Sequence, residues 1–113
     1  MFTTPELGRV GLSETEALHA GYGIRIATMP VSAIPRARTV GQLDGAWKAV
    51  VERGTDRILG AALHGRGSSE VIAVIHMAML GDVPYQQLRD AVITHPTMAE
   101  GLQLLFSDAF LAP

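Results

Sequence analysis

The sequence of 113 residues contains no cysteine, only one lysine and few aromatic side chains. The absence of cysteine excludes disulfide bonds, cysteine-ligated metals and a thiol nucleophile within this chain. It also fits a protein of the cytoplasm, where we expect this one to be found. The eight arginines are scattered among acidic residues and the formal net charge is −2. We therefore expect no nucleic acid partner, which would need clustered positive charge.

Long apolar runs are also missing. The longest run, residues 71–80, is interrupted by His76 and is too short for a bilayer, which needs about 20 apolar residues. Met1 is not followed by a basic segment and an apolar stretch, so no signal peptide is visible. The four histidines, at positions 19, 64, 76 and 95, do not have the spacing of metal ligands. We expect neither a membrane partner nor a metal site.

Hydrophobic residues make up 48% of the chain, which is enough for one domain with one core. Periodicity and turn signals predict the order strand, helix, three strands, three helices. The strands are expected at 9–12, 24–31, 47–52 and 57–64, and the helices at about 14–20, 70–80, 85–93 and 98–110. This order predicts an α+β fold, in which helices pack on a small, mostly antiparallel sheet.

Two helix starts have specific signals. Ser13 followed three residues later by Glu16 predicts a capping box at the start of the first helix. The segment 65–69 is rich in glycine and serine, follows a strand and precedes a helix, as a dinucleotide-binding turn does. The third glycine of that motif is replaced by Glu70, whose charge would repel a pyrophosphate. We therefore expect a tight turn with a serine cap, and a following helix that is apolar nearly all round and buried on more than one face.

His95 and Glu100 are the candidate catalytic residues. His95 stands just before the predicted last helix and Glu100 in its first turn. A carboxylate that holds one ring nitrogen would fix the tautomer of the imidazole and raise its pKa, as suits a general acid/base. The alternative is structural: Thr97 and Glu100 form a capping box, and His95 is an ordinary loop residue. The spacing alone leaves both interpretations open.

Several motifs stand in a fixed order along the chain: Thr4-Pro5-Glu6, Val10-Gly11-Leu12-Ser13-Glu14, Arg57-Ile58-Leu59-Gly60-Ala61, Ser69-Glu70-Val71-Ile72 and His95-Pro96-Thr97-x-x-Glu100. In this order they resemble the C-terminal dimerisation domain of flavoprotein pyridine nucleotide-disulfide oxidoreductases, such as glutathione reductase, dihydrolipoamide dehydrogenase and mercuric reductase. The resemblance covers about residues 3–107. Residues 30–38 and 88–96 resemble the branch that includes the reactive-chlorine-resistance and hypothiocyanite reductases. Mercuric reductase itself is disfavoured, because its vicinal cysteines have no counterpart in the tail 108–113.

The resemblance implies that residues 1–113 form a single dimerisation domain, a fragment that lacks N-terminal FAD- and NAD(P)-binding domains. The abrupt start of the sequence also favours a fragment. The full-length enzyme would use FAD, NAD(P)H and a redox-active disulfide, whereas the isolated chain would be inactive and bind no cofactor. His95, oriented by Glu100, would act as acid/base in the active site of the partner subunit of a homodimer. His95 and Pro96 would lie near the partner's flavin, and their peptide bond is a candidate for the cis isomer.

Two alternatives remain at this stage. The chain could be a free-standing, non-catalytic α+β interaction module in which Thr97 and Glu100 only cap a helix. It could also be a small-molecule-binding domain that uses the turn at residues 65–69.

Overall fold

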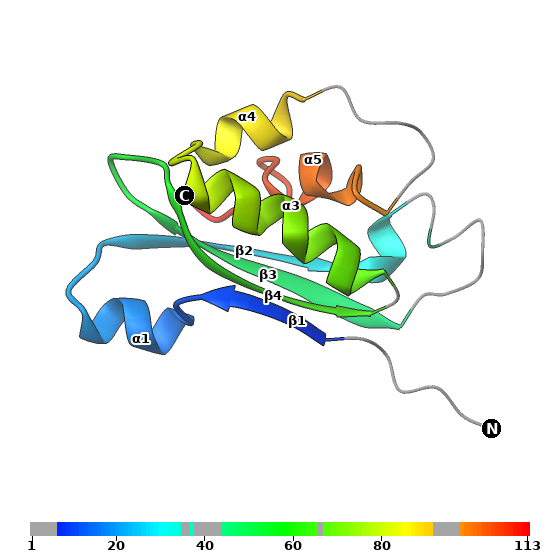
Figure 1. Ribbon diagram of the computed structural model, residues 1–113, viewed down its shortest axis with the longest axis horizontal. Helices are drawn as coiled ribbons and strands as arrows, with labels where there is room; N and C mark the ends of the chain where they lie inside the picture. Colours follow the sequence, from blue (N-terminus) through cyan, green and yellow to red (C-terminus); the bar gives the residue numbers. More distant parts are fainter. Residues whose placement is uncertain (1–6, 35–36, 38–43, 66, 92–97) are drawn as a thin grey trace.

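A computed structural model describes residues 7–34, 37, 44–65, 67–91 and 98–113. Four strands form one antiparallel sheet in the order β1-β4-β3-β2. Helices α3, α4 and α5 cover one face of this sheet, and the short helix α1 lies on the other (Figure 1). The α+β prediction is therefore confirmed. In chain order the elements are β1 (Leu7–Gly11), α1 (Glu14–His19), β2 (Ile24–Pro30), a short 3-10 helix η1 (Val31–Ala33), β3 (Gly45–Glu52), β4 (Ile58–Gly65), α3 (Ser68–Leu80), α4 (Tyr85–Arg89) and α5 (Gly101–Leu105).

The core lies between the sheet and α3–α5. Alternate residues of the two central strands point toward the helices, as the period of two requires. Trp47 of β3 pairs in register with Leu63 of β4, and both side chains are fully buried. Val71 and Ile75 of α3 pack into the same cluster. None of the helices in the described ranges has the length and apolarity needed to cross a membrane.

Helix α1 begins as predicted. The Ser13 backbone N–H donates to Glu16 Oε1 over 2.9 Å, and the Glu16 backbone N–H donates to Ser13 Oγ over 3.1 Å. The hydrogen bond from the Ser13 backbone N–H is the largest cause that holds the pKa of the Glu16 carboxyl below its ordinary value, and the Ser13 side chain is the next. The helix ends at His19, and Gly21 follows with the left-handed φ of 90° that glycine adopts without strain.

Helix α3 buries one face only. Val71, Ile75 and Ala78 are buried, whereas Met77 and Leu80 are each 68% exposed. The prediction that this helix is buried on more than one face is wrong for the single chain. The physical reason is that the sheet is the only layer against which α3 packs within the described part of the chain, so its outer apolar side faces solvent.

The last two helices are shorter than predicted. Helix α4 ends at Arg89 instead of residue 93, and α5 spans Gly101–Leu105 instead of 98–110. Residues 98–100 form successive turns, in which the Gly101 N–H donates to the Met98 carbonyl. Beyond α5 the chain returns to the sheet, where Leu111 pairs with Ala27 of β2 and is almost completely buried. This non-local pairing ends the helix early.

Candidate functional site

Glu100 is the one member of the predicted catalytic pair that the structure describes. It is half-buried and occupies the N-cap position of α5, with φ −66° and ψ −14°. The predicted helix start at Met98 is wrong by three residues. His95, Pro96 and Thr97 lie outside the described residues, so the His95–Glu100 pair, the His95–Pro96 cis bond and the Thr97 capping box all stay predictions.

The backbone beside Glu100 is held against the core by a close approach at Gly101. A Cβ atom at Gly101 would lie 2.8 Å from Cζ3 of Trp47 and 2.8 Å from Cδ1 of Ile34. Both of these side chains are fully buried, so they have little room to move. Glycine at this position therefore lets α5 rest directly on the indole ring, which fixes the backbone position of Glu100. The role of Gly101 could not be predicted from the sequence, because a glycine near a helix start has many ordinary explanations.

A hydrogen bond joins the described residues on the two sides of positions 92–97, among which His95 stands in the sequence. The Gln103 side-chain amide of α5 donates to the Ala91 carbonyl, just after α4. Helix α4 is in turn tied to the sheet by the buried ring of Tyr85. The Arg25 guanidinium of β2 lies 5.6 Å from the centre of that ring and donates to its hydroxyl over 3.1 Å. Ala91 and α4 are thus connected to α5 and to the sheet by contacts between described residues.

The turn before α3 does not fit a dinucleotide. The Ser68 hydroxyl donates to the Gly65 carbonyl over 2.6 Å, and the N-cap residue is Gly67 with a left-handed φ of 81°. The expected serine cap is therefore wrong. A Cβ atom at Gly67 would lie only 3.2 Å from Cγ of Met98, and Glu70 places a carboxylate in the first helical turn. A pyrophosphate would meet this side chain and this negative charge, which argues against the small-molecule alternative.

The described residues contain no group of three histidine, aspartate or glutamate side chains that could hold a metal ion. His76 lies on the exposed side of α3. The other two described histidines, His19 and His64, are also exposed and lie on different elements. The described histidines therefore do not form a common site, and Glu100 at the start of α5 is the only predicted catalytic residue within the described ranges.

Comparisons with known proteins show which family and which relatives this chain resembles. Residues 1–106 match the family described as "Pyridine nucleotide-disulphide oxidoreductase, dimerisation domain". The solved structure of the HOCl-induced flavoprotein disulfide reductase RclA from Escherichia coli has a TM-score of 0.86 and 45% identity, covering 88% of this chain and 23% of that chain. Dihydrolipoyl dehydrogenase of Thermus scotoductus is 37% identical over 90% of this chain and 22% of its own length.

Mercuric reductase of Staphylococcus aureus is 33% identical over 91% of this chain and 19% of its own length. The higher identity to RclA agrees with the predicted resemblance to the reactive-chlorine-resistance branch. The chain spans less than a quarter of the length of each of these relatives.

Proposed function

The chain belongs to the pyridine nucleotide-disulphide oxidoreductase dimerisation domain family, and on that premise we propose that it pairs the subunits of an FAD-dependent, NAD(P)H-linked disulfide reductase. In this proposal the chain is one domain of a longer polypeptide, whose remaining part carries the cofactors and the redox-active disulfide. His95 and Glu100 of one subunit serve the active site of the other. The single observation that carries the proposal is the family match over residues 1–106.

Homodimer formation is supported by the exposed side of α3. Val74, Met77 and Leu80 lie on that side and are 38%, 68% and 68% exposed. Large apolar side chains gathered on one helix mark an interaction surface more often than scattered ones do. In a two-fold dimer the same patch is used by both subunits, so a second copy would cover each patch with its own. Dimer formation would therefore remove the apolar outer side of α3 from water.

The proposed chemistry of this domain is proton transfer. The imidazole of His95 takes the proton from the attacking thiol of the partner subunit and later returns it. The Glu100 carboxylate holds the other ring nitrogen and thereby fixes the tautomer. Because α5 rests on Trp47 through Gly101, the backbone that carries Glu100 is fixed relative to the sheet. The turn before α3 does not fit a dinucleotide, so we assign FAD and NAD(P)H to the remaining domains.

The test uses the full-length enzyme and its NAD(P)H-dependent turnover. His95→Ala should lower turnover by about 10²- to 10⁴-fold, because that is the usual contribution of a general acid/base. Glu100→Gln should lower it less, because the imidazole stays in place. Flavin absorbance should be unchanged in both variants.

Glu70→Gln is the matched control, because Glu70 is an exposed carboxylate in the first turn of another helix of the same domain. It should leave turnover unchanged. Full turnover in His95→Ala would remove His95 from the mechanism. A longer protein without flavin or reductase activity would support the free-standing interaction module instead.

A further inference from the structure

The sheet face opposite α3–α5 is only half covered. Helix α1 shields one end of it, where Ala17 and Val50 are buried. The other end carries two rows of residues that run across all four strands in register. The rows are Leu7–His64–Ala46–Pro30 and Arg9–Ala62–Lys48–Thr28. Most of these side chains are exposed, Leu7 by 62%.

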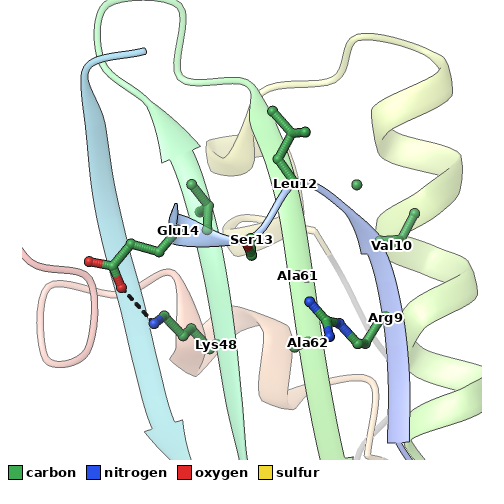
Figure 2. A pocket seen from close by; sticks show the side chains of 10 residues that line it. Arg9, Val10, Leu12, Ser13, Glu14, Lys48, Ala61 and Ala62 are labelled. Carbon is green, nitrogen blue, oxygen red and sulfur yellow. Dashed lines mark hydrogen bonds and ion pairs between the residues drawn. The ribbon is translucent and has the colours of Figure 1, made fainter. Parts of the chain in front are cut away.

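A hollow of about 200 Å³ lies between the second of these rows, which contains Arg9, Ala62 and Lys48, and the start of α1. Figure 2 shows the Arg9 side chain extending from β1 over β4, beside the small side chain of Ala62. On the other side of the hollow, Lys48 Nζ lies 2.6 Å from Glu14 Oε1 and is turned toward that carboxylate. The floor of the hollow therefore consists of small and apolar side chains, and the two cationic side chains of Arg9 and Lys48 lie at its edges.

The two cations are not equally compensated. Glu14 forms an ion pair with Lys48, whereas Arg9 has no ion pair or hydrogen bond with a carboxylate in the described part of the chain and acts on Glu16 only by charge, beyond ion-pair distance. A guanidinium binds a carboxylate through two parallel hydrogen bonds and is the preferred cation at interfaces between protein surfaces. The hollow therefore has space and positive charge for one additional carboxylate side chain.

We propose that the uncovered half of this sheet face is the surface on which the rest of the longer polypeptide docks, with an Asp or Glu side chain from that part pairing with Arg9. This inference rests on the proposed function, because it requires the chain to be one domain of a larger enzyme. The relatives are more than four times as long as the stretch that matches, so most of such an enzyme lies outside this domain. The mixture of small apolar and polar residues in the two rows is typical of an interface between domains of one chain.

A second copy of the chain is the less suitable occupant of this face. A two-fold contact would bring the same two rows of both copies into one interface, and these rows contain no Asp or Glu side chain that could pair with Arg9. The exposed side of α3, on the opposite side of the sheet, is apolar and suits a second copy better. The two faces therefore have different chemistry and take different partners.

Lys48 provides a direct probe, because it is the only lysine of this chain. We would acetylate the full-length enzyme with an amine-reactive reagent and follow the peptide that contains Lys48 by mass spectrometry. The reference is the added amine of the Arg53→Lys variant, in the exposed turn after β3 and beyond the uncovered half. Lys48 should react at least about tenfold more slowly than the reference, because its reaction requires the docked domain to open. Equal rates would overturn the proposal.

The ion pair with Glu14 could by itself slow the reaction of Lys48, so Glu14→Gln is the necessary control. Protection that persists in Glu14→Gln supports docking, and protection that disappears overturns it. Arg9→Ala should raise the reactivity of Lys48 at least about threefold, because it removes the proposed acidic contact, whereas Arg9→Lys should stay close to the parent enzyme. An unchanged rate in Arg9→Ala would refute the role of Arg9.

Failure of this inference can be distinguished from failure of the proposed dimer. Light scattering measures the mass of the same samples, and Arg9→Ala should remain a dimer because α3 is untouched. A monomeric parent enzyme would contradict subunit pairing while Lys48 stayed protected. A dimeric enzyme with reactive Lys48 would contradict only the docking surface.

Discussion

Replacing Gly101 by alanine tests whether α5 is fixed against the core. The new methyl group would lie 2.8 Å from the Trp47 ring and from Ile34 unless the helix moves. Overpacking of this kind costs about 1–3 kcal/mol. Alanine stabilises a helix by about 0.5–1 kcal/mol relative to glycine, which offsets part of this cost. The free energy of unfolding should therefore fall by about 1–2 kcal/mol. Urea unfolding followed by the fluorescence of Trp47, the only tryptophan, should show a midpoint lower by about 1 M.

Gly23→Ala is the matched control for this experiment. Gly23 has no left-handed φ, and a Cβ atom there would meet only Cδ and Cβ of Arg53, at 3.7 and 3.8 Å. This variant should be as stable as the parent or more stable by up to about 1 kcal/mol, because alanine restricts the unfolded chain. If Gly101→Ala were as stable as Gly23→Ala, α5 would be free to shift, and the reasoning that fixes Glu100 would be refuted.

Three further predictions concern other parts of the domain. Met77→Glu should convert the full-length enzyme from dimer to monomer in light scattering, because it places a charge within the exposed apolar side of α3; an unchanged mass would contradict the role of α3. Gln103→Ala should lower turnover by about 10- to 100-fold with flavin retained, because it frees the Ala91 flank of the segment that contains His95; normal turnover would contradict this. The lowered pKa of Glu16 stabilises the fold above the ordinary carboxyl pKa, and this contribution is lost as pH falls through the lower folded-state pKa. Urea titrations of Glu16→Gln at several pH values should show a free energy of unfolding that lacks this contribution to its pH dependence. The same pH dependence in Glu16→Gln and in the parent protein would refute the role of Glu16.

Local signals predicted the sheet and the first helix well. The capping box at Ser13 and Glu16, the hairpin of β3 and β4 and the antiparallel arrangement all depend on residues close together in the sequence. The C-terminal part was predicted less well, because its structure depends on distant partners. Leu111 pairs with Ala27 of β2 and ends the last helix early, and no local periodicity contains that contact.

The candidate site could be predicted only in part. Glu100 was identified from its spacing to His95, but the support beneath it comes from Gly101 lying on Trp47, which are 54 positions apart. The apolar pattern of α3 predicted burial on more than one face, with a second copy of the chain covering one of them, and within the single chain its outer side is exposed. A helix that is apolar all round but packed on one side only is typical of a subunit interface. The sequence of one chain does not show where the second copy lies.

The central claim is that the histidine of one subunit serves the active site of the other, and mixed dimers test it most directly. One subunit would carry His95→Ala, and the other would have its redox-active cysteines replaced by serine. Each variant alone should be inactive. Random pairing of equal amounts makes half of the dimers mixed, each with one complete site if His95 acts across the interface, so about one quarter of the parent turnover should return. If the mixture stayed as inactive as its components, His95 would act within its own subunit, and the account would be contradicted.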